Sequence, residues 1–440
     1  MSTVSRPPTG APVTEPLAVP PLPPPGSLTR RVLGHPRLIP HHRLLASVLL
    51  VNAGVLGYAV AAPGPVAVDT LSHAALVNFT LAVLIRQQYV INALFRIATA
   101  APLTWPLRVR WALSKVYHFG GLHIGGAVAG TLWFLALTVR LTHDGAPLAT
   151  LLVSWAPAVV LTVVALTALP ALRARFHDAF ERVHRFGGWA ALALLWAQTL
   201  LVAHDRGTSL VASPGPWLLA LVTFSIALPW LRLRRVPVAL ERPSSHVVLA
   251  HFDHGVTPFA GSATAISRSP LTEWHSFANV PAPGRSGFRL TVSRAGDWTG
   301  EFIDELPDTV WVKGIPTAGV ANIETLFRRV VYIATGSGIG PCLPHLLAGT
   351  VPARLVWAAR SPRATYGDAL VDEILAAQPD AVVWDTATHG KPDMAALAHA
   401  VWQESGAEAV ICISNRRLTR AVVHALEQRG IPAHGAIWDS

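Results

Sequence analysis

Two similar motifs place histidines beside a pair of glycines. The segment YHFGGLH covers residues 117–123, and RVHRFGG covers residues 182–188. Each motif stands at the start of an apolar stretch, so its imidazoles are expected at the same edge of two neighbouring helices. Two neutral imidazoles on facing helices are what a six-coordinate haem iron needs. The motifs therefore predict haem b, or another metal, held by His118 or His123 together with His184. An interfacial or hydrogen-bonded role is the alternative.

Two further histidines repeat this spacing. His143 follows His123, and His204 follows His184, each by the same interval of 20 residues. Twenty helical residues rise roughly 30 Å, so this pair is expected at the opposite edge of the same two helices. It predicts either a second metal site or two interfacial histidines. The glycines in the motifs could clear room for a porphyrin or let the helices pack closely.

A glycine-rich turn follows an apolar run at residues 330–341, VVYIATGSGIGP. The run predicts a buried strand, a sharp turn and the start of a helix, where proline is tolerated. Backbone N–H groups of such a turn and the helix dipole favour a phosphate. The turn therefore predicts a dinucleotide site, with an ordinary strand–helix turn as the alternative. The candidate binding residues are Thr335, Gly336, Ser337, Gly338, Ile339, Gly340 and Pro341.

Polar residues follow the next expected strand of the same domain. Arg360, Ser361, Arg363 and Tyr366 come after the apolar run 353–358. Ligands of parallel sheets lie at the carboxyl ends of strands. Basic residues there could bind the 2′-phosphate of NADPH, which would favour NADPH over NADH, or could simply be solvated.

Composition places part of the chain in lipid. Hydrophobic residues make up 51% and charged residues 14% of the 440 residues, against about 25% charged in soluble proteins. Mean hydropathy is +0.41. Six apolar segments are about long enough to cross a bilayer. They lie near 43–62, 72–97, 118–141, 149–171, 185–204 and 215–232.

Basic residues alternate along these segments. They gather before the first segment, between the second and third, between the fourth and fifth, and after the sixth; the other connections hold only Arg140 and Arg206. This bias predicts an integral protein of the plasma (inner) membrane with both termini in the cytoplasm. The formal net charge of +10 is thereby explained by membrane topology rather than by nucleic-acid binding. The two cysteines suggest neither a disulfide framework nor a thiolate metal site.

Arg86 interrupts the second apolar segment. A charge at that depth costs at least ~2.5 kcal/mol, so Arg86 is expected to face the bundle interior and a partner. It could grip a haem propionate or an acidic substrate, or join a hydrogen-bond network between helices.

The chain divides into four parts. Residues 1–42 are rich in proline and predict a disordered tail, and residues 43–235 form the six-span helical membrane bundle. Short β-rich runs at 236–325 predict a small antiparallel β-barrel. Alternating strands and helices at 326–440 predict an α/β nucleotide-binding domain with a parallel sheet. Its strands are expected at 330–334, 353–358, 381–384 and 409–413.

This order of parts resembles the ferric reductase and NADPH oxidase superfamily. The stretch GIGPCLPHL at 338–346 and the ending GAIWDS at 435–440 most closely resemble its TmpA-type membrane proteins with a ferredoxin-reductase-like C-terminal region. The segment EWHSFA at 273–278 stands where that superfamily has a flavin motif, and GDWT at 296–299 and the turn at 335–341 are similar to two others. The resemblance implies FAD on the barrel beside Arg268, His275, Ser276 and Phe277.

The resemblance also implies a reaction. Electrons would pass from cytoplasmic NAD(P)H through flavin to haem, and then to an unknown acceptor or small-molecule substrate. The sequence departs from the superfamily at Leu132 and Gln198, where the second pair of haem histidines would stand. The alternative is a haem-free membrane protein with a degenerate reductase domain and a regulatory or biosynthetic role.

Overall fold

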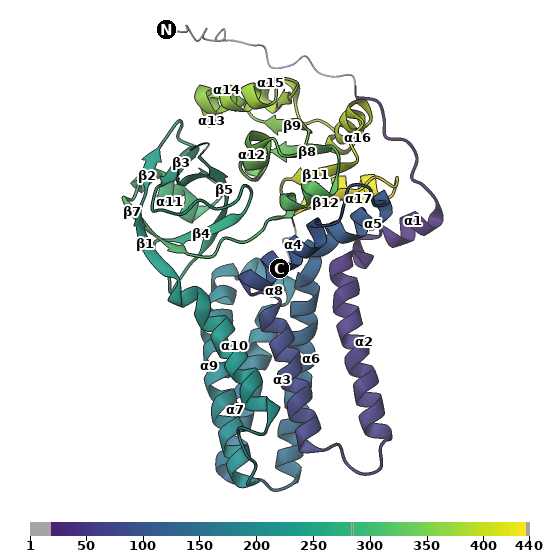
Figure 1. Ribbon diagram of the computed structural model, residues 1–440, viewed down its shortest axis with the longest axis vertical. Helices are drawn as coiled ribbons and strands as arrows, with labels where there is room; N and C mark the ends of the chain where they lie inside the picture. The colour runs from purple at the N-terminus through teal and green to yellow at the C-terminus, as the bar shows by residue number, and fades with distance from the viewer. Residues whose placement is uncertain (1–18, 283, 285, 437–440) are drawn as a thin grey trace.

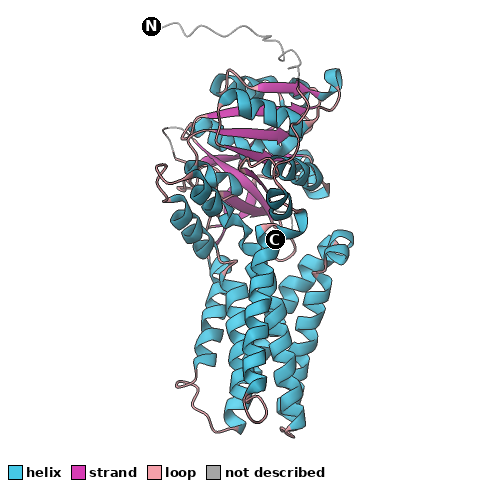
Figure 2. Ribbon diagram, turned by 90° about the vertical axis from the view of Figure 1, so that its right-hand side faces the viewer, coloured by secondary structure: helices cyan, strands magenta, loops and turns pink. Residues whose placement is uncertain are grey.

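The computed structural model describes residues 19–282, 284 and 286–436. It consists of a head, built from a β-domain and an α/β domain, above a bundle of long helices (Figure 1). The bundle helices run side by side and away from the head (Figure 2). They are α2 (Pro40–Ala61), α3 (Val68–Leu84), α6 (Gly120–His143), α7 (Leu148–Thr167), α9 (His177–Asp205) and α10 (Pro214–Leu231).

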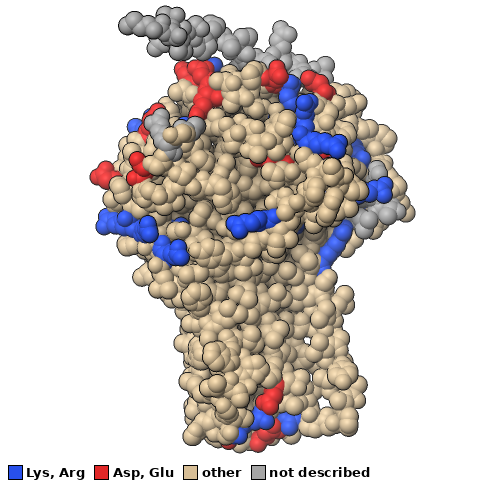
Figure 3. All heavy atoms as spheres, in the orientation of Figure 1, with Lys and Arg blue, Asp and Glu red and all other residues tan. Residues whose placement is uncertain are grey.

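Among the described residues, five helices are long and apolar enough to cross a membrane, or six if one bent pair counts as a single span. The visible flank of the bundle carries almost no charge, whereas Lys and Arg gather along the lower margin of the head (Figure 3). Asp, Glu, Lys and Arg reappear at the far tip. This distribution is the one expected of a bundle that crosses an apolar layer.

The second apolar segment differs from the prediction, because it is two helices rather than one span over 72–97. The axis turns by 73° between α3 and α4 (Gln88–Thr99). The side chain of Gln87 accepts a hydrogen bond from the backbone N–H of Tyr89 and starts the new helix. Asn92 on α4 then bonds the carbonyl oxygen of Pro316 and the N–H of Ala318, both at 2.9 Å. These polar contacts hold α4 against the head, at an angle to the bundle helices.

Short helices complete the junction between bundle and head. They are α5 (Leu107–Leu113), η2 (Ser114–Phe119) and α8 (Pro170–Arg175). The stretch 19–42 also differs from the expected disordered tail, since it holds α1 (Leu28–Leu33) and η1 (Pro36–Leu38). Arg429 donates to the carbonyl oxygen of Pro23 at 2.7 Å, so the proline-rich stretch lies against the α/β domain. The rest of the expected tail, residues 1–18, lies outside the described residues.

The β-domain is an antiparallel sheet of seven strands in the order β1-β7-β4-β5-β6-β3-β2. Its inner face buries Ile266, Leu290 and Val292, and Phe302 of α11 (Asp297–Glu305) closes this core. The strands are β1 (Leu233–Pro237), β2 (Ala239–Glu241), β3 (Val247–Phe252), β4 (Ala263–Ser267), β5 (His275–Pro281), β6 (Phe288–Ser293) and β7 (Thr309–Lys313). This barrel-like sheet occupies the range predicted for the small barrel.

The α/β domain has a parallel sheet of five strands in the order β10-β9-β8-β11-β12. Helices cover both faces, over Tyr332 and Trp357 on one and Val331 and Val410 on the other. The strands are β8 (Val330–Thr335), β9 (Ala353–Ala359), β10 (Val382–Asp385), β11 (Ala409–Ile413) and β12 (Ala433–Gly435). The helices include α12 (Ile339–Ala348), α13 (Pro362–Tyr366), α14 (Asp368–Ala377), α15 (Thr386–His389), α16 (Met394–Ser405) and α17 (Arg416–Glu427). The predicted α/β domain is thus observed; the three-residue β12 was missed.

Candidate functional site

The glycine-rich turn lies at the point where the strand order of the parallel sheet reverses. β8 is followed by β9 on one side, and the chain later returns to β11 on the other, so the crevice opens between β8 and β11. The turn runs through η4 (Gly336–Gly338) into α12. At its base, the hydroxyls of Thr335 and Ser414 hydrogen-bond to each other across these two strands. The predicted turn therefore stands where open α/β sheets bind their ligands.

Two positions in the turn require glycine. Gly336 has a φ of +50°, in the left-handed region that side chains disfavour. A Cβ at Gly338 would collide with the backbone carbonyl oxygen of Ile413. Ser337 between them is exposed. The turn thus presents backbone to solvent at the start of α12, which fits a phosphate group.

Of the residues after β9, one arginine remains available. Arg360 is exposed, and no contact of its side chain is recorded among the described residues. Arg363 instead forms ion pairs with Asp368 and Asp372, at 3.0 and 2.8 Å. Tyr366 is buried against Trp357, and the backbone N–H of Ser361 is bonded to Asp385. The residues therefore fit a 2′-phosphate through Arg360, while the other three hold the loop in place.

A buried polar triad includes a residue of α12, the helix that follows the glycine-rich turn. The sequence did not predict it. His345 of α12 contacts Glu324 at 2.6 Å, and the Tyr332 hydroxyl donates to the same carboxylate at 2.7 Å. Burial and the nearby Glu324 raise the pKa of Tyr332. The imidazole Nε2 of His345 has no recorded partner and abuts Gly261, where a Cβ would clash with it. The triad therefore lies where the α/β domain meets the β-domain.

The residues expected beside a flavin contact one another. Arg268 pairs with Glu301 and Glu305 of α11 and lies 5.7 Å from the centre of the Trp298 ring. The ring of Trp298 stacks on His275 with centroids 4.0 Å apart. These contacts neutralise Arg268, so it is not a free phosphate ligand.

What remains for a flavin is an aromatic face and a helix start. Phe277 lies nearly parallel to Trp298 at 6.3 Å, and Trp298 is only half-buried. A Cβ added at Gly296, just before α11, would meet nothing within 4 Å. Backbone N–H groups at a helix N-terminus can bind the pyrophosphate of a flavin dinucleotide, and a partly open aromatic ring can stack on its isoalloxazine. The β-domain therefore fits a flavin through α11 and its stacked rings, with Ser276 exposed on the neighbouring strand.

Glu273 orders the loop in front of these rings. Its carboxylate accepts hydrogen bonds from the Ser267 hydroxyl and from the backbone N–H groups of Arg268 and Ser269. Burial alone would raise its pKa, but these bonds and His275, 3.2 Å away, lower the pKa of Glu273 to about 2.

Of the predicted metal-binding histidines, the structure brings together His123 and His184. Their ring centroids are 6.1 Å apart and the rings are inclined by 62°. His123 Nδ1 lies 2.8 Å from the carbonyl oxygen of Ala82, an arrangement that leaves Nε2 as the free nitrogen. Of the predicted histidines, these two are the pair that could hold a metal ion between them. Among the described residues, no group of three or more His, Cys, Asp or Glu is placed to hold a metal ion.

The remaining candidates lie elsewhere. His118 is buried in η2, beside Tyr117 and away from the His123–His184 pair. His143 is 84% exposed beside Asp144, and His204 is also exposed; no contact joins them among the described residues. The expected outer metal pair is therefore not assembled here.

The glycines next to the histidine motifs serve helix packing. A Cβ at Gly121 would collide with the carbonyl oxygen of His41 on α2. A Cβ at Gly126 would lie 2.7 Å from the carbonyl oxygen of Asn78 on α3. These two positions let α6 approach its neighbours and clear no space for a porphyrin. Gly188 of α9, by contrast, faces open space.

Arg86 differs from its expected position. It is exposed at the bend between α3 and α4 rather than inside one span, because the helix ends at Leu84. It lies within electrostatic range of both His123 and His184. Binding of an acidic group by Arg86 beside that pair therefore stays a prediction.

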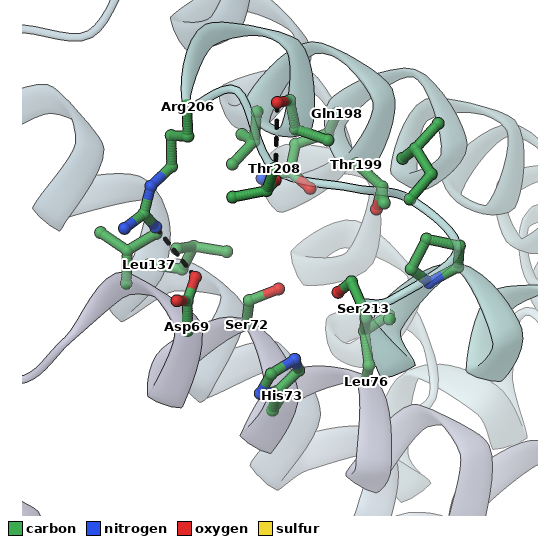
Figure 4. Close-up of a pocket in the computed structure, with 16 residues that line it drawn as sticks. Asp69, Ser72, His73, Leu76, Leu137, Gln198, Thr199, Arg206, Thr208 and Ser213 are labelled. Carbon is green, nitrogen blue, oxygen red and sulfur yellow. Dashed lines mark hydrogen bonds and ion pairs between the residues drawn. The ribbon is translucent and has the colours of Figure 1, made fainter.

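A cavity opens at the far end of the bundle (Figure 4). Ser72 and His73 of α3 lie opposite Ser213, and an ion pair of 2.9 Å between Arg206 and Asp69 borders the cavity. Gln198, one of the two positions where the resemblance would put a second haem ligand, is buried in its wall. The other, Leu132, is 59% exposed on the outside of α6. A second haem therefore has neither ligand at these positions.

Known proteins similar to this chain are reductases by name. Residues 320–440 match the family model "Adenylate-forming reductase 03009, C-terminal domain". Over 427 residues the chain is 43% identical to adenylate-forming reductase 03009 of Coprinopsis cinerea, covering 94% of this chain and 41% of that protein. Adenylate-forming reductase 06235 of the same fungus is also 43% identical, over 91% of this chain and 40% of that protein. The chain thus spans about two fifths of the length of these relatives.

Solved structures give weaker similarities. A ferredoxin NADP+ reductase from Neisseria gonorrhoeae with bound FAD and NADP covers 47% of this chain and 98% of its own, at 14% identity and a TM-score of 0.37. A flavohemoglobin from Malassezia yamatoensis with bound FAD and heme covers 84% of this chain and 98% of its own, at 12% identity and a TM-score of 0.41. The predicted ferric-reductase relationship is not among these similarities and stays a prediction.

Proposed function

We propose that this chain is a membrane-embedded oxidoreductase that takes reducing equivalents from NAD(P)H. The observation that carries the proposal is the turn Gly336–Gly338, which opens at the strand-order reversal and leads directly into α12. A pyrophosphate bound there would meet backbone N–H groups and the positive end of a helix dipole. The names of the curated relatives support a reductase.

NADPH is the proposed donor. Arg360 stands exposed after β9, the strand adjacent to β8, and its guanidinium can pair with a 2′-phosphate in two-pronged geometry. Thr335 and Ser414 hold β8 and β11 together at the floor of the crevice. Each of these residues positions the dinucleotide rather than taking part in chemistry.

A flavin and a haem iron are the proposed redox groups. When bound, a flavin links the two-electron chemistry of a nicotinamide to the one-electron chemistry of iron. Trp298 and the start of α11 would hold the flavin, and His123 and His184 would hold the iron. The carbonyl of Ala82 fixes the orientation of the His123 ring.

The bundle is proposed to cross the plasma (inner) membrane with both termini in the cytoplasm. Its charge-free flank and the basic margin of the head support this placement (Figure 3). NAD(P)H would then reach the head from the cytoplasm. The cavity lined by Ser72, His73 and Gln198 would open on the opposite side, where an acceptor could bind.

A second candidate is a haem-free reductase in a biosynthetic pathway. The packing of Gly121 and Gly126 against α2 and α3 favours it, since these glycines leave no porphyrin space. So does the name of the relatives, which couples adenylate formation with reduction. In this version hydride would pass to an activated carbonyl substrate, and His123 and His184 would be structural.

An absorption spectrum of the full chain, purified in detergent, tests the proposal. Flavin absorbance and a Soret band that shifts on addition of NADPH are expected, and the H123A and H184A variants should lose the Soret band alone. Colourless protein that binds NADPH would support the haem-free candidate. Absence of NADPH and NADH binding would refute both.

A further inference from the structure

A second cavity lies where the last bundle helix passes into the β-domain. It is bordered by the end of α10, the edge strand β1 and its neighbour β7, and the loop after β3. Arg232, Arg234, Lys313 and His254 line it, and its recorded lining contains no Asp or Glu. The apolar part of the wall includes Val256, Pro258, Phe288 and Val312.

The cationic groups of this cavity are poorly neutralised. No ion pair is recorded for Arg232 or Arg234 among the described residues, in contrast to the many paired arginines of the head. The ammonium of Lys313 instead lies 4.5 Å from the centre of the Trp274 ring, on the opposite face of β1 and β7 from Arg234. Burial and the charge of Arg185, partly offset by Glu181, lower the pKa of Lys313 to about 8. The charges that act on Lys313 thus belong to α9, and its ammonium does not add to the charge of this cavity.

His254 adds an unused polar atom. Its Nδ1 is buried without a recorded hydrogen-bond partner, and its ring packs edge-on against Phe252 and Phe288. Burial, and then the charge of Arg234, lower the pKa of this imidazole, partly offset by the neighbouring Asp253, which does not line the cavity. A neutral imidazole can still donate one hydrogen bond to an anion.

We infer that this cavity binds a phosphate group. Two guanidiniums and an imidazole donor around one space match the charge density of a phosphate better than that of a neutral ligand. Basic pockets at the inner edge of membrane helices attract anionic lipid headgroups. The cavity directly follows α10, so a phospholipid headgroup of the inner leaflet is the expected source. That source depends on the proposed membrane placement, whereas phosphate binding itself does not.

The chain supplies a matched control. Arg235 is the next residue on β1, but it does not line the cavity, and its Nε donates to the Thr309 hydroxyl at 3.1 Å. R234Q and R235Q each remove one arginine charge from the same strand. Only R234Q removes it from the cavity.

The experiment measures ligand-induced thermal stabilisation of the full chain in a neutral detergent. The ligands are dihexanoyl phosphatidic acid, dihexanoyl phosphatidylcholine and inorganic phosphate. We expect phosphatidic acid to bind the wild type and R235Q with similar affinity. It should bind R234Q and R232Q about tenfold more weakly, the factor for the loss of one charged contact. Phosphatidylcholine should bind at least tenfold more weakly than phosphatidic acid.

The outcomes separate the two sources. Stabilisation by phosphatidic acid but not by inorganic phosphate assigns the cavity to a lipid headgroup, and equal stabilisation by both assigns it to a soluble phosphate compound. The inference is overturned if neither ligand stabilises the wild type, or if R234Q and R235Q weaken binding equally. NADPH binding, measured on the same samples, reports separately on the α/β domain, so failure of one proposal is distinguishable from failure of the other.

Discussion

Arg110 and Glu408 form a two-pronged ion pair that ties the helices below the head to the α/β domain. The Nη1–Oε2 and Nη2–Oε1 distances are 2.7 and 3.1 Å. The Arg110 side chain is 2% exposed, and its Nη1 also donates to the carbonyl oxygen of Leu326. The hydrogen bonds and charge of Arg110, followed by other nearby groups, lower the pKa of Glu408 despite partial burial. Head and bundle are thus joined by a desolvated charge pair.

Loss of either partner of this pair should destabilise the protein strongly. R110A leaves the largely buried Glu408 carboxylate without its two-pronged partner. E408A leaves the buried Arg110 guanidinium without its carboxylate. Each substitution should lower the free energy of unfolding by about 3–5 kcal/mol. Thermal unfolding of the full chain in detergent measures the effect. R328A is the control, because Arg328 is 65% exposed and lies 3.9 Å from the same carboxylate, so a change of no more than about 1 kcal/mol is expected. Equal effects of R110A and R328A would contradict this account.

The strands of the α/β domain and the dinucleotide turn could be predicted because their signal is local. A run such as Val330–Ala334 is apolar and rich in β-branched residues, and the glycines that follow it form a tight turn. The residues that join the parts carry no such signal. Arg110 and Glu408 are 298 residues apart, and the sequence around one does not indicate that it pairs with the other. The partners of Arg268, Glu301 and Glu305, are hidden for the same reason.

The bend at Arg86 was missed for another physical reason. Apolar composition continues through α4, so hydropathy alone describes a single span over 72–97. What ends the span is the capping bond of Gln87 and the two bonds of Asn92 to the head. Such contacts depend on the position of the head relative to α4. The pattern of apolar residues in the bundle does not indicate that position.

Substitution of Gly126 tests whether this glycine lets two helices pack closely or leaves room for a ligand. In G126A the new Cβ would lie 2.7 Å from the carbonyl oxygen of Asn78, which is backbone and cannot swing away. A loss of about 1–3 kcal/mol in the free energy of unfolding is expected from this overpacking. G57A on α2 is the control, since its Cβ meets nothing within 4 Å, and helix propensity predicts no loss. A G126A protein as stable as G57A would mean that α6 and α3 are not in close contact.

Replacement of Arg360 should change the preference between the two nicotinamide dinucleotides. R360Q removes the exposed charge after β9, so the dissociation constant for NADPH should rise about tenfold, while that for NADH should stay within about twofold. Isothermal titration of both ligands gives the ratio. R363Q is the matched variant, because its guanidinium is already held by Asp368 and Asp372. If R363Q alters the ratio and R360Q does not, the 2′-phosphate lies elsewhere.

Both cysteines should be inert in the folded protein. Cys342 and Cys412 are fully buried, and burial raises the pKa of Cys412 to about 12 and that of Cys342 above its ordinary value. Alkylation needs an accessible thiolate. Iodoacetamide at pH 8 should therefore modify neither thiol in the native protein and both after denaturation, as counted by intact-mass measurement. Rapid modification of one native cysteine would indicate that the α/β core opens.

The acid sensitivity of the β-domain should depend on Glu273. Its pKa is about 2 in the folded protein, against an ordinary value of 4.5, so the folded state favours the ionised carboxylate. A depressed pKa contributes stability that is fully present above about pH 4.5 and is lost as the pH falls from 4.5 towards 2. The stability difference between wild type and E273Q should therefore be constant from pH 7 to 5.5 and should shrink steadily below pH 4.5. Urea unfolding at a series of pH values measures this difference. Parallel curves down to pH 3 would mean that the Ser267 hydroxyl and the Arg268 and Ser269 amides do not hold an ionised carboxylate.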